Sequence, residues 1–216
     1  MLSALSAAVL GFLLGLKHAT DADHVVAVTA IVAREKSFAR AARVGAAWGL
    51  GHSMTVLLVG GALVGFRVAI PSRLGLGLEF LVALVLIGLG FSNLRKTDAA
   101  PAPTSADDRR AFTVGVVHGL AGSAAVVVLV LAAISDPVWA IAYLAVFGIG
   151  TVAGMTLVTA LIAAPMQVVQ RAREGPDAGT RVVRVQRGIR LAAGVLSIAM
   201  GVVLARTIIV EGGLFR

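Results

Sequence analysis

Near its start, the chain places two histidines and two aspartates within seven residues: His18, Asp21, Asp23 and His24. Apolar sequence lies on both sides of this motif. A charged side chain at the centre of a membrane costs about 2.5–3.5 kcal/mol on insertion scales, so two aspartates there need compensation. Imidazole nitrogens and carboxylate oxygens are ligands for divalent transition metals. The motif therefore predicts a site for a divalent cation inside the membrane.

A second interpretation of the motif needs no ligand. Lys17 precedes Asp21 by four residues and would neutralise it on a helix, which gives a salt-bridged kink. That pairing leaves Asp23 and both histidines unexplained, and Asp21 keeps two open roles, metal ligand or partner of Lys17. On a continuous helix His18, Asp21 and His24 share one face, whereas an interrupted helix lets all four side chains converge.

The remaining histidines, His52 and His118, also lie in apolar stretches, and no loop contains one. A single histidine in a membrane helix is explained by a hydrogen bond between helices. Because all four histidines of the chain lie in apolar stretches, we favour a common role for them. Neutral imidazole is both a metal ligand and a proton carrier. We therefore add His52 and His118 to the candidate metal ligands.

Composition assigns the chain to the membrane. Of its 216 residues 58% are hydrophobic and 14% are charged, with a mean hydropathy of +0.95. The absence of cysteine excludes disulfides and thiolate metal sites, and disfavours copper(I). The net charge of +8 comes from basic residues in short loops, so it indicates orientation in a lipid bilayer and no nucleic-acid partner.

Six apolar runs predict an all-α membrane protein with six transmembrane helices, at roughly 4–33, 44–66, 77–94, 112–134, 138–165 and 189–210. The first run exceeds the ~20 residues that one span needs, and the polar motif lies near its middle, so we expect an interrupted helix. Lysine and arginine concentrate in the first, third and fifth loops. By the positive-inside rule these loops are cytoplasmic, and both termini lie outside a cell membrane.

The two halves of the chain resemble each other. Residues 12–18 match 112–118 in their phenylalanine, glycine and histidine, and residues 48–51 match 147–150 in their glycines. Three spans per half is an odd number, so the halves form an inverted repeat. We predict a first repeat at 1–96, a cytoplasmic linker at 97–111 and a second repeat at 112–216. Ala121 and Ser123 replace Asp21 and Asp23, so the first repeat supplies most of the site.

The motif His18-Ala-Thr-Asp21-Ala-Asp23-His24 resembles the signature of the nickel/cobalt transporter family. The stretch 50–53 around His52 resembles a second family motif, while 117–123 and 147–151 resemble the six-span branch that includes urease accessory membrane proteins. The resemblance implies that the motif's histidines and aspartates bind Ni²⁺ or Co²⁺ and that His52 assists; His118 is added from the residues alone. Well-studied importers have eight spans, and the histidine-rich loop of some exporters is absent, so the direction of transport stays open.

These observations predict a permease for Ni²⁺ or Co²⁺ that holds no cofactor, is no enzyme, and exposes the ion alternately as one half rocks against the other. One alternative is another substrate, such as Zn²⁺, Mn²⁺, Fe²⁺ or protons. A second is a non-transporting accessory factor that acts with partners in metalloenzyme maturation, although the longest loops are only about 20 residues. A membrane metalloenzyme is disfavoured because no His-Glu-x-x-His motif occurs.

Overall fold

A computed structural model describes residues 4–33, 35, 37–68, 70–95, 105–134, 136–171 and 178–214. All regular structure along these residues is helical, which confirms the predicted all-α class. The elements are α1 (Ala4–His18), α2 (Ala22–Val32), α3 (Phe38–Thr55), the π-helical turn η1 (Val56–Gly60), α4 (Gly61–Phe66), α5 (Ser72–Arg95), α6 (Ser105–Ala133), α7 (Pro137–Arg171) and α8 (Ala178–Val210). Because α3, η1 and α4 follow one another directly, they form one continuous helix.

Within the described residues, four helices are long and apolar enough to cross a membrane: Phe38–Phe66, Ser72–Arg95, Pro137–Ala164 and Val183–Val210. The segments Leu5–His18 and Ala22–Val32 are apolar but shorter. The predicted span 112–134 lies in α6, and its side chains at 123–133 fall outside the described part of the chain. The chain is therefore a membrane protein, and six complete spans remain a prediction.

The first apolar run is interrupted at the His/Asp motif, as its length predicts. Helix α1 ends at His18 and α2 begins at Ala22. Tight turns fill the gap: the amide of Thr20 donates to the carbonyl of Lys17, and the amide of Asp21 donates to that of His18. Ala19 is buried, while Thr20 and Asp21 are exposed. The chain thus passes from α1 to α2 through two exposed residues, Thr20 and Asp21.

Several helix ends differ from the expected ones: α3 begins at Phe38 instead of near 44, and α5 begins at Ser72 instead of near 77. Helix α6 begins at Ser105, inside the stretch expected to form the linker. Helix α7 continues beyond residue 165 to Arg171, and α8 begins at Ala178 instead of near 189. Apolar runs mark only the part of a helix that lipid or protein surrounds, whereas backbone hydrogen bonds continue through polar residues in water. Hydropathy therefore underestimates the length of these helices, because their ends are polar.

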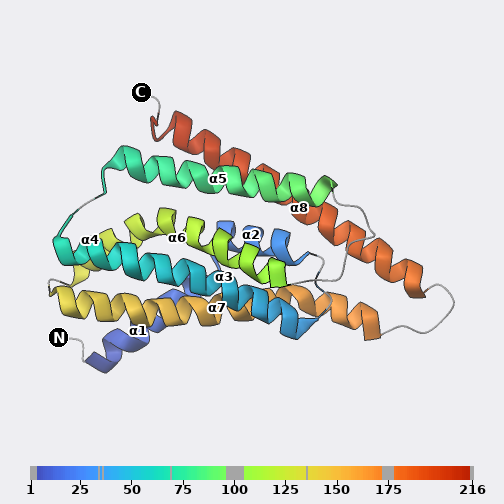
Figure 1. Cartoon of the computed structure of the whole chain (residues 1–216), viewed down its shortest axis with the longest axis horizontal. Helices are drawn as coiled ribbons and strands as arrows, with labels where there is room; N and C mark the ends of the chain where they lie inside the picture. The colour runs from blue at the N-terminus through green and yellow to red at the C-terminus, as the bar shows by residue number, and fades with distance from the viewer. Residues whose placement is uncertain are drawn as a thin grey trace.

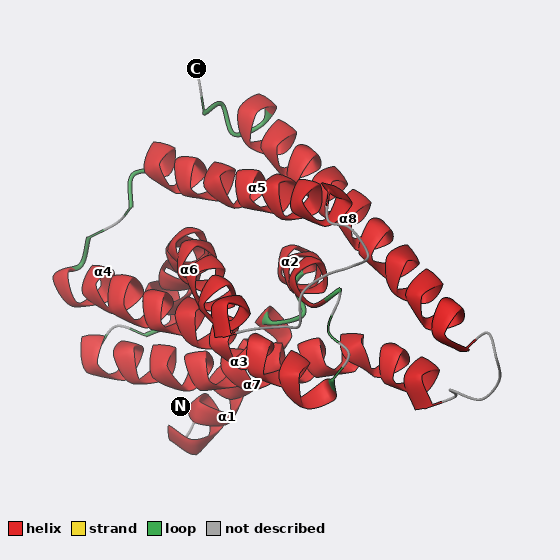
Figure 2. Ribbon diagram, turned by 45° about the vertical axis from the view of Figure 1, so that its right-hand side comes forward, coloured by secondary structure: helices red, strands yellow, loops and turns green. Residues whose placement is uncertain are grey.

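Helices from the two halves of the chain interleave. Helix α3 lies against both α6 and α7, α1 lies against α7, and α5 lies against α8. Figure 1 shows α5 and α8 together along one side of the molecule and α3 and α7 along the other, with the short α2 between them. Figure 2 gives the same arrangement from a second direction. Neither half of the sequence forms a separate body.

Glycines allow the backbones of these helices to touch. In each contact, the space that a glycine Cβ would occupy is taken by a carbonyl oxygen of the facing helix. The pairs between α1 and α7 are Gly15 with Phe147 and Gly150 with Phe12, and the pairs between α3 and α6 are Gly115 with Trp48 and Gly51 with Phe112. In the alignment of the two halves, Gly15 and Phe147 correspond to Gly115 and Trp48, and Gly150 and Phe12 correspond to Gly51 and Phe112. The two contacts between α1 and α7 are therefore equivalent to the two contacts between α3 and α6. Equivalent residues therefore make equivalent contacts.

Candidate metal centre

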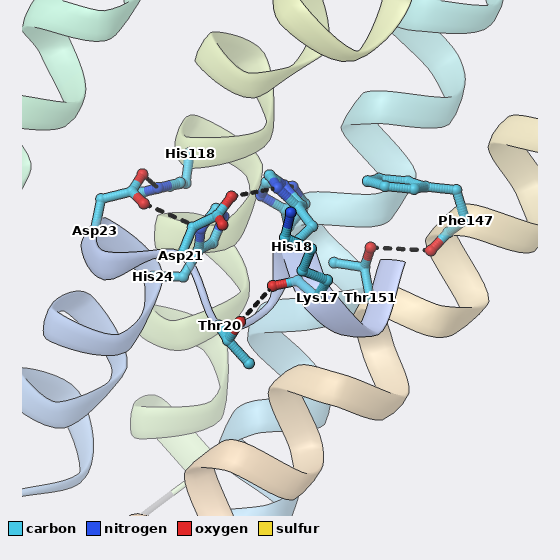
Figure 3. A network of polar contacts seen from close by, with 10 residues as sticks. Lys17, His18, Thr20, Asp21, Asp23, His24, His118, Phe147 and Thr151 are labelled. Carbon is cyan, nitrogen blue, oxygen red and sulfur yellow. Dashed lines mark hydrogen bonds and ion pairs between the residues drawn. The ribbon is translucent and has the colours of Figure 1, made fainter. Parts of the chain in front are cut away.

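The break between α1 and α2 brings the polar motif against three other helices, α3, α6 and α7 (Figure 3). His18 is the last residue of α1, Asp21 is the N-cap of α2, and Asp23 and His24 lie in the first turn of α2. The other two histidines come from α3 and α6. The four imidazole rings form one cluster, with centroids 4.5 Å apart for His18–His24 and His24–His118, 5.0 Å for His24–His52, 5.2 Å for His18–His52 and 6.0 Å for His52–His118.

His18 faces a carboxylate on one side and an imidazole on the other. Its Nδ1 donates to Oδ2 of Asp21 at 2.8 Å, and its Nε2 lies 3.2 Å from Nε2 of His52. A carboxylate only accepts hydrogen bonds, so the proton of a neutral His18 is on Nδ1. The lone pair of Nε2 therefore points into the cluster. This pairing of carboxylate with histidine is the arrangement that orients metal-bound imidazoles in proteins.

Asp23 joins α2 to α6. Nε2 of His118 donates to Oδ2 of Asp23 at 2.8 Å, and the other oxygen lies 3.3 Å from Nδ1 of His24, without hydrogen-bond geometry. The carboxylate sits in the first turn of α2, where the helix dipole favours negative charge. Two imidazoles and the helix end thus hold a carboxylate against the cluster, although apolar helices surround it.

His24 lies at the centre of the cluster. Its side chain is almost fully buried, with 2% exposure, and neither ring nitrogen has a hydrogen-bond partner. Nδ1 of His52 and Nδ1 of His118 are buried and unpartnered as well. Leaving a buried polar atom without a partner costs about 1–3 kcal/mol. Buried polar atoms without hydrogen-bond partners, within one cluster of imidazoles, are expected where a ligand completes the site.

Asp21 and Lys17 form the exposed edge of the motif. The side chain of Asp21 is 49% exposed, and its ion pair is with His18. Within the described residues no ion pair joins Lys17 to Asp21; Lys17 is exposed, and its carbonyl accepts from the hydroxyl of Thr20. The salt-bridged kink is therefore not the structure that this segment adopts.

The ligand atoms fall into two groups of three that share one residue. The first group is His18, His24 and His52, and the second is Asp23, His24 and His118; within each group the ligand atoms lie within 4.8 Å of one another. One group offers three nitrogens, and the other offers two nitrogens and an oxygen. The structure thus gathers five of the six residues that the sequence selects and leaves Asp21 at the rim, against His18.

Aromatic side chains that sequence reasoning did not select line the cluster. Trp48 is fully buried, and its ring centroid lies 5.5 Å from that of His24 and 5.8 Å from that of His118. Phe147 lies 5.3 Å from His18. These two rings pack against the imidazoles. The alignment of the two halves pairs Trp48 with Phe147, but an aromatic residue in an apolar run does not by itself indicate a metal site.

The second half of the chain keeps a counterpart of His52. Thr151 is fully buried on α7, and its hydroxyl donates to the carbonyl of Phe147 at 2.9 Å. It occupies the position that the alignment of the halves pairs with His52. The position equivalent to His52 thus holds a hydroxyl that is hydrogen-bonded within its own helix. The candidate ligands therefore come mainly from the first half of the chain.

Comparisons with known proteins identify a family and a relative to which this chain is similar. The family model described as "High-affinity nickel-transport protein" matches residues 4–90, a range that includes every candidate ligand except His118. A protein named "Urease accessory protein UreH", from Bacillus sp. (strain TB-90), is 32% identical over 228 residues, which cover 98% of this chain and 96% of that protein. No solved structure matches the chain.

An all-helical membrane protein with a buried His/Asp cluster is the class that the fold and the site define. Within that class, the chain belongs to the high-affinity nickel-transport protein family. The family resemblance inferred from the sequence is thereby confirmed. Membership and the name of the relative indicate a transporter or an accessory membrane protein and not an enzyme.

Proposed function

We propose that this protein is a permease for Ni²⁺ or Co²⁺ and that the His/Asp cluster binds the ion during transport. The observation that carries the proposal is His24, which is buried with no hydrogen bond at either ring nitrogen and lies among three other imidazoles and the carboxylate of Asp23. Burying these polar atoms among apolar helices without hydrogen bonds costs free energy when no ion is bound. An ion that accepts lone pairs from several of these atoms removes the cost.

The distances in the cluster support binding of a small transition-metal ion. Two ligands that bind one ion at ~2.1 Å lie about 3–3.4 Å apart. Nε2 of His18 and Nε2 of His52 are 3.2 Å apart, within this range. Nitrogen-rich ligands favour later first-row metals over Mg²⁺ and Ca²⁺, which prefer oxygen. Asp21 and Asp23 offset the double positive charge of the ion.

The architecture supports transport by alternating access. Many secondary transporters consist of inverted repeats with an ion site at an interrupted helix near the membrane midplane. We infer two such repeats here, at 1–96 and 112–216, from the matched sequence segments and from the glycine contacts that the repeat alignment exchanges. With the basic loops cytoplasmic, both termini lie outside the cell membrane.

A second function is favoured by one comparison. The relative is named a urease accessory protein. In that role the protein would serve metalloenzyme maturation, by supplying nickel across the membrane or by handing it to partner proteins without transporting it. Supplying nickel across the membrane agrees with our proposal, whereas handing nickel to partner proteins without transport does not. Flux of the ion through the isolated protein separates them.

The test is nickel flux into vesicles of phosphatidylethanolamine and phosphatidylglycerol that contain the purified protein and a trapped fluorescent chelator. Wild type is compared with His24→Ala and with Thr29→Ala, a control on the same helix that loses only a hydrogen bond to the carbonyl of Val25. We expect flux in wild type and Thr29→Ala, competition by cobalt, and at least a tenfold loss in His24→Ala. Nickel binding without flux in wild type would instead favour the non-transporting accessory role.

A further inference from the structure

We propose that α2 moves together with α5 and α8 when the ion site opens, and that Asn93 and Arg190 are positioning residues that hold α2 on this pair. The inference rests on the proposed transport function. It also names the moving parts, which are not the two halves of the sequence. The described helices divide into a four-helix unit, formed by α1, α3 with η1 and α4, α6 and α7, and an α2–α5–α8 unit.

Close backbone contacts define the four-helix unit. Glycines bring α1 against α7, α3 against α6 and α3 against α7, so that carbonyl oxygens fill the space where Cβ atoms would be. The last of these contacts places Gly45 against the carbonyl of Met155. Helices that interlock through their backbones cannot slide past one another without steric collision. These four helices are therefore expected to move as one body.

A second set of contacts joins α5 to α8. Gly90 lies against the carbonyl of Gly194, and Gly194 lies against that of Gly90. The buried hydroxyl of Ser197 donates to the carbonyl of Leu86 at 2.7 Å. Among the described glycines, every close approach of this kind lies within one of the two units, and none bridges them.

Buried polar contacts attach α2 to the α5–α8 pair. Nδ2 of Asn93 donates to the carbonyl of Ala30 at 2.6 Å, near the end of α2, where carbonyls lack helical partners. Nη1 of Arg190 donates to the carbonyl of Asn93 at 2.5 Å. Asn93 is 3% exposed and Arg190 is 5% exposed. A continuous path of hydrogen bonds thus runs from α2 through α5 to α8.

The boundary between the units passes through the candidate ion site. His18, His52 and His118 belong to the four-helix unit, whereas Asp23 and His24 belong to α2. Ala19 is fixed against Gly154 of α7, so the exposed residues Thr20 and Asp21 are where the chain crosses from one unit to the other. A shift of the α2–α5–α8 unit would separate the ligands and release the ion.

Cross-linking tests which helices move, because the chain has no cysteine of its own. Nη2 of Arg110 on α6 contacts the hydroxyl of Ser92 on α5 at 3.5 Å, so a Ser92→Cys/Arg110→Cys pair joins the two units. Arg43 on α3 and Asp108 on α6 are 2.6 Å apart and lie within the four-helix unit, so Arg43→Cys/Asp108→Cys is the matched control. Both pairs are bridged in the vesicles with a bifunctional thiol reagent that has a reducible spacer.

We expect the 92/110 bridge to lower nickel flux at least tenfold, with recovery on reduction, and the 43/108 bridge to change it less than twofold. Full flux with the 92/110 bridge, or equal inhibition by both bridges, would overturn the proposal. Absence of flux in uncross-linked wild type would contradict the transport function itself, and with it this inference. The two failures are therefore distinguishable.

The positioning role of Asn93 is tested with Asn93→Leu, which removes the donor to Ala30. The control, Ser197→Ala, removes an equally buried hydrogen bond of the same unit that does not involve α2. The visible absorption spectrum of bound Co²⁺ reports its ligands, and a role in stability alone would not change it. We expect Asn93→Leu to alter this spectrum and to reduce flux at least tenfold, while Ser197→Ala preserves both. An unaltered spectrum and flux in folded Asn93→Leu would overturn the assignment.

Discussion

Nε2 of His18 and Nε2 of His52 lie 3.2 Å apart, although 34 residues separate them in the chain. The contact exists because α1 ends at His18 and because α3 and α1 both lie against α7. Asp21 holds the proton of His18 on Nδ1, so the lone pair of Nε2 faces His52. Two imidazole nitrogens at this distance in an apolar interior are spaced as ligands of one metal ion.

The two aspartates of the motif are predicted to differ in their effect on binding. The carboxylate of Asp23 contacts His118 and His24, whereas that of Asp21, within the described part of the chain, pairs with His18 and is half exposed. Replacing a charged ligand costs more than replacing the partner that orients one, for which 10–100-fold is typical. We expect Asp23→Asn to raise the Kd for Ni²⁺ more than about 100-fold and Asp21→Asn to raise it about tenfold. Equilibrium binding to purified protein measures both, and a larger effect for Asp21→Asn would reverse the assignment.

Lys17 is predicted to be dispensable for binding. It is exposed, and the ion pair of Asp21 is with His18. We expect Lys17→Ala to fold normally and to change the Kd for Ni²⁺ less than about threefold, because among the described residues no ion pair joins Lys17 to Asp21 and even an exposed pair would contribute only about 0–1 kcal/mol. Membrane insertion and nickel binding of the variant check this. Failure of Lys17→Ala to fold would instead support a structural pair with Asp21.

Glycine substitutions should show opposite effects on stability. A Cβ at Gly15 would overlap the carbonyl oxygen of Phe147, whereas the space around Gly88 is open. Alanine is favoured over glycine in a helix by about 1 kcal/mol, so only the collision makes Gly15→Ala unfavourable. We expect thermal unfolding in detergent to occur at lower temperature for Gly15→Ala and at equal or higher temperature for Gly88→Ala. If Gly15→Ala unfolded at the same temperature as Gly88→Ala, the result would argue against the tight contact between α1 and α7.

Glu35, in the connection between α2 and α3, should make stability depend on pH. Burial raises the pKa of this carboxyl; Arg40 at 3.4 Å opposes the shift, and Asp107 and Asp108 reinforce it. A carboxyl whose pKa is higher in the folded protein binds its proton more tightly there. Its contribution to stability is therefore greatest below the ordinary glutamate pKa and is lost as pH rises through the raised value.

Glu35→Gln removes this titration, so the variant should unfold at higher temperature than wild type at neutral pH, and the difference should vanish below the ordinary glutamate pKa. One kcal/mol corresponds to about 2–4 °C in a chain of this size, and a shift of that order is expected. Thermal unfolding of both proteins from acidic to neutral pH measures it. Destabilisation by Glu35→Gln at neutral pH would mean that the ion pair with Arg40 outweighs the cost of burial.

Much of this fold follows from the sequence because membrane helices carry a strong local signal. The excess length of the first apolar run, with Asp21 and Asp23 in its middle, predicts the break that α1 and α2 show. The end of α7 at Arg171 and the start of α6 at Ser105 were not predictable from hydropathy, because helices continue into water. The interleaving of α1 with α7 depends on distant contacts that no local pattern contains.

The candidate site was predictable in its composition but not in its geometry. Histidine is rare in membrane helices, so the occurrence of all four there indicates one cluster, and the structure forms it. Spacing alone could not separate the positions of the two aspartates, because a break at Thr20 lets either one face the cluster. Trp48 was not selected because an isolated aromatic residue in an apolar run carries no chemical signal; its position beside His24 depends on how α3 packs against its neighbours.

The most direct test of the central claim is X-ray absorption spectroscopy of the purified protein loaded with Ni²⁺, compared with the His24→Ala variant. A cluster built around His24 predicts nitrogen and oxygen neighbours at ~2.1 Å together with the outer-shell scattering of several imidazole rings. In His24→Ala, binding or imidazole scattering should be lost. A bound ion in wild type with no imidazole scattering, or an identical spectrum in both proteins, would contradict the assignment of the ion to this site.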